Sequence, residues 1–304
     1  MDIRPWKPGD ESAIRALFEA VFATPMSEAF WNWRYRDHPA GPPMIMLAWQ
    51  GDRLAAHYAA SYAPVLIEGE PQLSALSMTT MTHEDFRGQG LLERTGLALY
   101  EEQRQRGLIG CWGFPNRNVN VARRGKLGWQ GIADVPVLQR RISAEEPFAA
   151  IAIRQTDRVP AQYDSLPRAS APVRADRARA FHLWRTDANP QSRYSHLTLA
   201  DDSGYALIKP WKDGAYDLVL LEAGDPASLR QLIQACLASV QALGGTLLNA
   251  WSLAHRPERV ALERAGFLPT GMVTNFGGRS FTPGAPHLTT AGNWKLDMLD
   301  SDLY

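Results

Sequence analysis

The stretch THEDFRGQGLLER, residues 82–94, places two glycines and an arginine between two segments of regular pattern. Before it, QLSALSMTTM (residues 72–81) is a short run of small, apolar and β-branched residues, which predicts a strand. After it, LLERTGLALYEEQRQRG (residues 91–107) predicts a long helix that stops at Gly107. The sequence therefore predicts a tight turn that leads from a strand into the first turn of a helix.

This turn has two interpretations: a simple reversal of the chain, or a binding loop for a phosphate group. The first amides of a helix lack internal partners and carry a partial positive charge, which favours bound anions. Gly88 and Gly90 allow close approach of the backbone, and Arg87 and Arg94 can add charge-assisted contacts. The setting favours phosphate binding, although the motif alone does not name the ligand.

The chain has 304 residues, of which 45% are apolar, which suits one large domain or two of about 150 residues. Its 32 basic residues balance its 32 acidic ones, which argues against a nucleic-acid or membrane partner. Cys111 and Cys236 lack the spacing of a metal site, so we expect no metal and a reducing compartment. The N-terminus lacks a signal-peptide core and no run reaches the roughly 20 apolar residues of a membrane span, so we expect a cytoplasmic protein.

Part of the sequence repeats. FWNWRYRDHP (residues 30–39) and FHLWRTDANP (residues 181–190) share Phe, Trp, Arg and Pro at the same spacing. Two tandem copies of one α/β unit are the simplest explanation. The polar segment SAEEPF (residues 143–148) is the expected junction, which places the two domains at residues 1–147 and 148–304.

The predicted order of elements in the first copy is β-α-α-β-β-β-α-β-α-β. An antiparallel meander is followed by a helical crossover, which makes residues 72–81 and 108–114 parallel neighbouring strands. The second copy has AGDPAS (residues 223–228) where the first has its glycine-rich turn. Asp225 would repel a phosphate and Pro226 has no amide to donate, so we expect only the first copy to bind one.

FRGQGLL (residues 86–92) resembles the acyl-CoA-binding loop of the GNAT N-acetyltransferase superfamily, whose pattern is Arg/Gln-x-x-Gly-x-Gly/Ala. The order of elements and KLGW (residues 126–129) are also similar to that family. Arg87 and Gly90 match the first two fixed positions, whereas Leu92 stands where a small residue is usual. The resemblance implies two tandem GNAT-like α/β domains, each a mainly antiparallel sheet with a splayed central parallel strand pair, and a degenerate second domain without the loop.

The same resemblance implies acetyl-CoA as the cosubstrate. Its pyrophosphate would lie on amides of residues 87–92, and its pantetheine would follow the strand end near residues 81–83. Asn116, just after the neighbouring strand, is a candidate for orienting the acetyl group. The candidate residues for cofactor binding are Met81, Thr82, His83, Arg87, Gly88, Gln89, Gly90, Leu91, Leu92 and Asn116.

Acetyl transfer to an amine needs a base and donors for the developing oxyanion. His83, Glu84 and Asn116 are the catalytic candidates, with either His83 or Glu84 as the base; the alternative for Glu84 is a solvated acid at the start of the loop. The family often has a tyrosine acid where this chain has Arg124, so the thiolate leaves unprotonated or takes its proton from elsewhere. Cys111 fits a small core residue better than a reactive thiol.

Arg36, Tyr58 and Tyr62 are the candidate contacts for the acceptor. The two tyrosines are four residues apart on a predicted strand and so face the same side, which is either the acceptor groove or the core. Trp33 and Arg34 recur in the second copy, which favours a structural role for them. Arg36 does not recur, so it is either a substrate contact or a surface arginine.

The leading hypothesis is an N-acetyltransferase that moves an acetyl group from acetyl-CoA to the primary amine of a small molecule, such as an amino sugar or a sugar nucleotide, by direct attack. One alternative is a non-catalytic acyl-CoA-binding module that regulates or scaffolds. Another is transfer of a different acyl or aminoacyl group. The sequence leaves the acceptor and the oligomeric state open.

Overall fold

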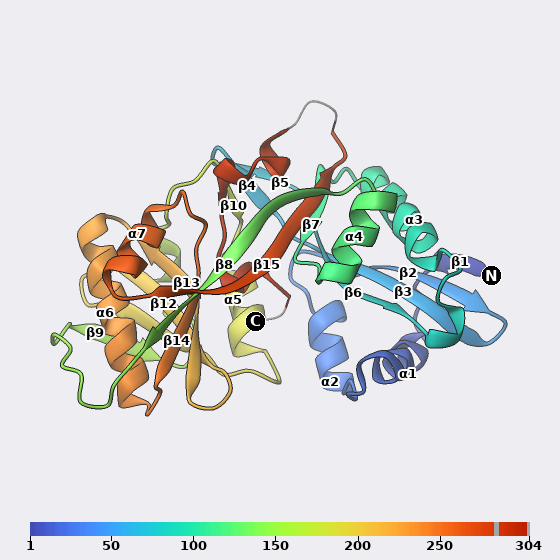
Figure 1. Ribbon diagram of the computed structural model, residues 1–304. Helices are drawn as coiled ribbons and strands as arrows, with labels where there is room; N and C mark the ends of the chain where they lie inside the picture. Colours follow the sequence, from blue (N-terminus) through green and yellow to red (C-terminus); the bar gives the residue numbers. More distant parts are fainter. Residues whose placement is uncertain (283–285, 303–304) are drawn as a thin grey trace. The chain divides into compact units, whose positions relative to one another are not determined.

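The computed structural model describes residues 1–282 and 286–302, and it divides the chain into two compact units (Figure 1). Unit 1 comprises Met1–Ala133 with Asn275–Ala291, and unit 2 comprises Asp134–Thr274 with Gly292–Tyr304. Both units have a sheet flanked by helices, so the predicted α/β class is confirmed.

The sheet of unit 1 has the strand order β1, β2, β3, β6, β7. These strands span Asp2–Pro5, Met44–Gln50, Arg53–Tyr62, Ala75–Thr82 and Gly110–Gly113. The first four form an antiparallel meander, and β6 and β7 then pair in parallel. A hairpin of β4 (Val65–Ile67) and β5 (Glu70–Gln72) precedes β6. The predicted meander and parallel crossover are therefore confirmed.

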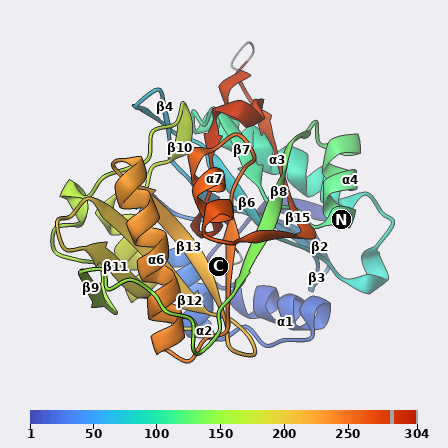
Figure 2. The ribbon, with the colours of Figure 1, turned by 60° about the vertical axis from the view of Figure 1, so that its left-hand side comes forward.

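Helices cover both faces of this sheet (Figures 1 and 2). Their bounds are Glu11–Phe22 for α1, Glu28–Trp31 for α2, Leu91–Gln105 for α3 and Arg117–Lys126 for α4. Ile45 and Leu47 of β2 join a core with α1 and α2, whereas Met44 and Met46 join a second core with α3. Alternate side chains of a strand point to opposite faces, so the apolar run of β2 feeds both cores.

Unit 2 has the strand order β8, β14, β13, β12, β11, β9. These strands span Gln130–Arg141, Leu247–Trp251, Ala215–Ala223, Gly204–Pro210, Ser195–Leu199 and Ile153–Thr156. Its helices are α5 (Arg179–His182), α6 (Pro226–Ala242) and α7 (Pro257–Arg264). A meander again leads through a long helix, α6, into a parallel strand pair, β13 and β14. Unit 2 therefore repeats the meander, the crossover helix and the parallel strand pair of unit 1.

The repeated aromatic motif has the same local structure in both units. In unit 1, α2 continues into a π-helical turn at Asn32–Arg36, and in unit 2 α5 continues into one at Leu183–Asp187. Arg34 and Arg185, which occupy equivalent positions in the two turns, are both buried. The domain boundary between residues 147 and 148 stays a prediction, because a unit defined by contacts need not coincide with a duplicated segment.

Strands β8 and β15 pair with strands that are not their neighbours in the chain. β8 follows α4 in the chain but pairs with β14 through residues 137–141. β15 (Leu268–Ser280) follows α7 but pairs with β7 through residues 277–280. The sheet of each unit therefore includes a strand that is distant in the chain from the other strands of that sheet or joins it at the far end of the chain segment.

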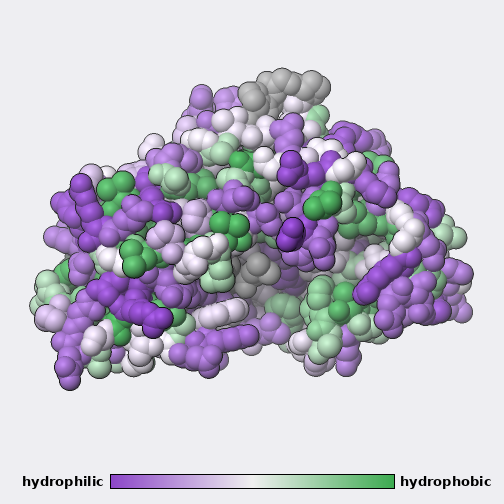
Figure 3. All heavy atoms as spheres, in the orientation of Figure 1, coloured by the Kyte–Doolittle hydropathy of each residue, from purple (hydrophilic) through white to green (hydrophobic). Residues whose placement is uncertain are grey.

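Within residues 1–282 and 286–302, no helix is long and apolar enough to cross a membrane. The same residues contain no group of three or more His, Cys, Asp or Glu side chains that could hold a metal ion. On the face drawn in Figure 3, hydrophilic residues surround smaller hydrophobic groups.

Candidate functional site

The glycine-rich turn adopts a backbone that favours glycine. A short helical turn, Glu84–Phe86, follows β6 directly. Beyond it, Gly88 and Gly90 have φ values of +78° and +70°, in the left-handed region. A Cβ at either position would meet nothing within 4 Å, so the preference for glycine comes from backbone conformation and leaves open space beside the chain.

Helix α3 begins at this turn with its first amides outside the helical ladder. Its N-cap residue is Gly90, whose carbonyl accepts from the Arg94 amide at 3.1 Å. The amides of Leu91, Leu92 and Glu93 come before this first helical hydrogen bond. Like the first amides of any helix, they have no acceptor within the helix. Because α3 has 15 residues, the aligned peptide dipoles add a partial positive charge at this end.

A cavity of about 230 Å³ lies at this turn. It is lined by Thr82, Phe86, Arg87, Gly88, Gly90, Leu91, Leu92, Glu93, Ala122 and Lys126. Arg87 and Lys126 bring positive charge to it, and Lys126 Nζ lies 3.7 Å from a carboxylate oxygen of Glu93. An elongated anion with an apolar portion fits this set of amides, cations and apolar walls, and the phosphate and pantetheine parts of acyl-CoA have that character.

Neighbouring contacts fix the start of the turn. Phe86 is buried, and the guanidinium of Arg53 lies 4.9 Å from the centre of its ring. Arg53 also donates to the Asp85 carboxylate at 2.6 Å, and this hydrogen bond lowers the pKa of Asp85. These contacts hold the backbone that leads into Arg87.

The structure brings most of the predicted cofactor-binding residues together. Thr82, Arg87, Gly88, Gly90, Leu91 and Leu92 all line the cavity. Gln89 is exposed on the same turn. The Met81 side chain does not line the cavity: it is 2% exposed and packs in the core beneath α1.

The catalytic candidates already have structural contacts. His83 caps the short helical turn, with Nδ1 accepting from the Asp85 amide at 3.3 Å. In that neutral tautomer Nε2 carries the proton. Glu84 is exposed, and its carbonyl accepts from the Arg87 amide at 3.2 Å. Asn116 is the N-cap of α4, where its Oδ1 accepts from the Val119 amide at 3.0 Å, so only its NH₂ group remains to donate to a ligand.

The acceptor candidates lie outside the cavity lining. Tyr58 is fully buried beneath α3, with its hydroxyl 2.7 Å from that of Tyr100. Tyr62 packs on the same core, as the spacing predicts, and accepts from Arg106 Nη1 at 3.2 Å. Arg36 is exposed, with its guanidinium 5.6 Å from the ring of Trp31. Their roles in binding an acceptor stay predictions.

Sequence reasoning missed Arg123. Helix α4 buries this side chain to 3% exposure, whereas Arg124 is exposed. The guanidinium of Arg123 donates to Ser77 Oγ at 2.7 Å and to Thr80 Oγ1 at 3.0 Å, both on β6. The spacing of residues could have indicated its burial. Arg123 lies four residues before the apolar Leu127, so the two residues lie on the same face of the helix.

In unit 2 the corresponding helix start is closed by its own side chain. Asp225 is the N-cap of α6, and its Oδ1 accepts from the amides of Ala227 at 2.7 Å and Ser228 at 3.0 Å. Hydrogen bonds from Ser228 and Ala227 lower the pKa of Asp225. Pro226 occupies the first turn without an amide hydrogen. These amides are therefore already paired with a carboxylate.

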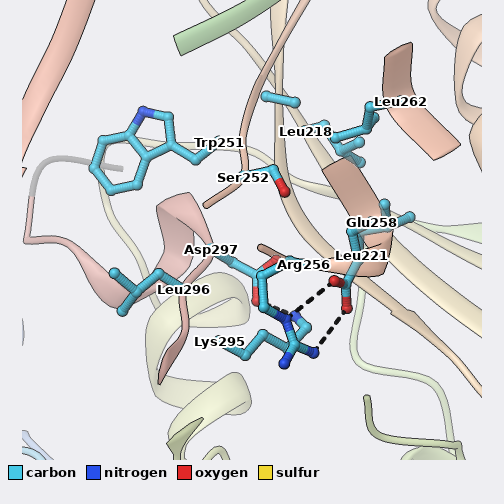
Figure 4. A pocket seen from close by; sticks show the side chains of 11 residues that line it. Leu218, Leu221, Trp251, Ser252, Arg256, Glu258, Leu262, Lys295, Leu296 and Asp297 are labelled. Atoms are coloured by element: carbon cyan, nitrogen blue, oxygen red, sulfur yellow. Dashed lines mark hydrogen bonds and ion pairs between the residues drawn. The ribbon is translucent and has the colours of Figure 1, made fainter. Parts of the chain in front are cut away.

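A second cavity, of about 10 Å³, lies in unit 2 and could hold little more than one water (Figure 4). Its charged side chains pair with one another: Lys295 with Asp297, and Arg256 Nε with a Glu258 carboxylate oxygen at 3.2 Å. The buried Arg177 joins the same network through Glu222, Asp297 and Asp300. We interpret this network as the anchor of the C-terminal segment, since its charges are compensated internally.

Comparison with known proteins agrees with this geometry. Residues 2–131, which include the turn and α4, match a family model described as an acetyltransferase (GNAT) domain. A search of curated proteins finds no match.

Several solved structures are similar over most of the chain. A GCN5-related N-acetyltransferase from Kribbella flavida is 15% identical, with 95% of this chain and 74% of that one covered and a TM-score of 0.66. Eis1 from Mycobacterium abscessus is 17% identical, with coverage of 92% and 74% and a TM-score of 0.64. A tandem GNAT protein from the clavulanic acid biosynthesis pathway is 13% identical, with coverage of 93% and 99% and a TM-score of 0.63. Residues 2–131 thus form a domain of the GNAT acetyltransferase family, in a chain with the fold of tandem GNAT proteins.

Proposed function

We propose that this protein is an acyl-CoA-dependent N-acetyltransferase that acetylates the primary amine of a small molecule. The observation that carries the proposal is the start of α3. There, Gly88 and Gly90 open the backbone, unpaired amides begin the helix, and Arg87 lies at the same cavity. This arrangement is in the part of the chain that matches the acetyltransferase family.

In this proposal, acetyl-CoA supplies an acetyl group activated as a thioester. The amides at the start of α3 and the charge of Arg87 bind its pyrophosphate. The Asn116 NH₂ group orients the acetyl oxygen, while His83 or Glu84 takes the amine proton directly or through water. For His83 this role requires that Nδ1 give up its contact with the Asp85 amide, so that one ring nitrogen has a lone pair free to accept the proton.

The second unit has a different role in this proposal. Its helix α6 is capped by Asp225, so it binds no acyl-CoA. The part of β15 that pairs with β7, residues 277–280, follows unit 2 in the chain and belongs to unit 1. The balanced net charge of the chain favours a small amine acceptor, such as an amino sugar or a sugar nucleotide, over nucleic acid or basic protein tails.

A non-catalytic acyl-CoA-binding module is the second candidate. It is favoured by the exposed arginine at position 124, where the family often has a tyrosine acid, and by the structural contacts of His83 and Asn116. Binding is common to both candidates, and turnover separates them.

Calorimetry with acetyl-CoA tests the loop. Gly90→Asp places a carboxylate beside the expected pyrophosphate, so we expect affinity to fall about ten-fold or more, which is roughly 1.4 kcal/mol. Gly224→Asp makes the same change before α6 in unit 2 and should leave affinity unchanged. Equal affinity of Gly90→Asp and the unaltered protein would overturn the loop assignment, and absence of acetyl-CoA binding would overturn both candidates. Tight binding without thiol release across a panel of small primary amines would favour the binding module.

A further inference from the structure

Arg123 is a buried cation whose contacts are to neutral groups. Its guanidinium hydrogen-bonds the hydroxyls of Ser77 and Thr80 and lies 4.5 Å from the ring centre of Trp129 and 5.2 Å from that of Tyr58. Its Nε is buried without a hydrogen-bond partner among the described residues. A buried charge is costly unless it is paired, so a position like this one favours any negative charge that arrives beside it.

A β-bulge brings the two hydroxyls to Arg123. In the pairing of β6 with β3, the register shifts between Tyr58 and Ala59, and Thr79 has a left-handed φ of +31°. Side chains of a strand alternate, so without the extra residue Ser77 and Thr80 would point to opposite faces. With it, both meet Arg123 on the face covered by α3.

Arg123 lies at the point where β6 and β7 stop pairing. Their last paired residues are Leu76 and Trp112, whereas β6 continues to Thr82. Thr80 and Thr82 are two residues apart on β6, and Thr82 lines the cavity at the start of α3. On α4, Ala122 lines that cavity and is the direct neighbour of Arg123. Arg123 thus lies on a helix that lines the cavity, and its two hydrogen-bond partners on β6 lie beyond the last residue that pairs with β7, at the fork between the two strands.

The thiol of Cys111 lies close enough to Arg123 for this charge to act on its pKa. Cys111 on β7 is fully buried, and burial raises the pKa of its thiol to about 12, while the charge of Arg123 acts in the opposite direction. Arg123 therefore favours the thiolate form of a sulfur near this fork.

We propose that Arg123 stabilises the CoA thiolate that leaves during acetyl transfer, a role that rests on the proposed function of this site. The amine nitrogen forms a bond to the thioester carbonyl carbon, the C–S bond breaks, and sulfur leaves with the electron pair. The ammonium proton passes to the base or to water, so the products are an amide, a thiolate and a proton. A permanent cation beside the sulfur removes the need to protonate it, which accounts for an arginine-lined fork in a chain that lacks the family's usual tyrosine.

The direct test is the pKa of the CoA thiol in its complex with the protein, followed by the ultraviolet absorbance of the thiolate. We expect this pKa to lie about one unit or more below that of free CoA, which is a ten-fold change in ionisation. Arg123→Met should abolish the decrease, whereas Arg123→Lys, which keeps the charge, should retain part of it. Arg124→Met, the same change at the exposed neighbouring position, is the matched control and should leave the thiol pKa unchanged.

Kinetics give a second readout. Arg123→Met should lower kcat by about 100-fold, as removal of a preorganised charge-stabilising donor does, with the KM for acetyl-CoA within about three-fold of the original. If Arg123 only wedges the strands apart, the thiol pKa of bound CoA will be the same in Arg123→Met and the unaltered protein. That result would overturn the inference while leaving the proposed function intact.

The unaltered protein provides a test that needs no variant. Binding of CoA at a pH between the thiol pKa values of bound and free CoA should release protons, measured by calorimetry in buffers of different ionisation enthalpy, because part of the thiol ionises on binding. Desulfo-CoA lacks the thiol and is the matched ligand. Equal proton release with both ligands would overturn the role of Arg123, whereas failure of either ligand to bind would instead contradict the proposed function.

Discussion

Asn116 combines a structural contact with a proposed contact to the ligand. Its Oδ1 caps α4 by accepting from the Val119 amide, which leaves its NH₂ group for the acetyl oxygen. Aspartate keeps a capping oxygen but has no NH₂ group, and alanine has neither. The two substitutions therefore separate the two roles.

We expect Asn116→Ala to lower the free energy of unfolding by about 1 kcal/mol, as loss of an N-cap usually does. Asn116→Asp should change it by less than about 0.5 kcal/mol, because aspartate is an equally good N-cap. If the NH₂ group orients the acetyl group, both variants should lose activity to a similar degree. Full activity of Asn116→Asp would show that this residue only caps the helix. Chemical denaturation and initial rates measure the two effects.

Local conformation explains which residues of the site could be predicted from the sequence. Gly88 and Gly90 were predictable, because a left-handed turn before a helix requires a residue type that the sequence shows directly. The burial of Tyr58 and Arg123 could not be predicted, because it depends on how α3 and α4 pack against the sheet. The same spacing that places Tyr58 and Tyr62 on one face does not tell whether a helix covers that face.

At the scale of elements, periodicity predicted the meander, the crossover helix and the parallel strand pair of unit 1. The β-bulge at Thr79 has no such signal, since a bulge belongs to the pairing of two strands. Residues distant in the chain contact the bulge. The Thr79 carbonyl oxygen lies 2.9 Å from His57 Nδ1, and the Oγ1 of Thr79 accepts from Arg34 Nη2 at 3.2 Å. The pairing of β8 with β14 and of β15 with β7 could likewise not be predicted, because the residue pattern of a strand does not identify its partner strand.

The pairing of β15 with β7 predicts how residues 1–147 behave alone. A fragment of residues 1–147 would lack β15, so β7, whose residues are all buried, would become an open sheet edge. We expect this fragment to aggregate or to remain insoluble. Co-expression with residues 148–304 should recover soluble material that contains both pieces, because the second piece supplies β15. Light scattering and co-purification measure the outcome, and a soluble, monomeric fragment that binds acetyl-CoA would contradict this account.

At the scale of the whole molecule, basic and acidic residues are equal in number, and one group of buried charges is compensated internally. In unit 2 the cations Arg177 and Lys295 are buried with Glu222, Asp297 and Asp300. Burial raises the pKa of Asp300 despite the adjacent charge of Arg177. Three buried histidines, His57, His182 and His196, give the protein a dependence on pH.

His57, His182 and His196 are buried, and burial lowers the pKa of each ring, to about 4 for His57 and His196. Burial acts by disfavouring the charged form. The unfolded chain titrates near the ordinary value of 6.5, so between that pH and about 4 it binds more protons than the folded protein. The stability that depends on these neutral histidines is therefore fully present above pH 6.5, and it is lost as the pH falls toward 4.

His57→Gln tests this dependence, because glutamine can still donate to the Thr79 carbonyl but does not titrate. We expect the unaltered protein to lose stability between pH 7 and pH 4.5, and the variant to lose less over the same range. The difference over this range should be about 2 kcal/mol, because most of the effect of a shift from 6.5 to about 4 is expressed by pH 4.5. Chemical denaturation at several pH values measures it. Parallel pH profiles for the two proteins would show that His57 is protonated in the folded state or does not titrate in this range.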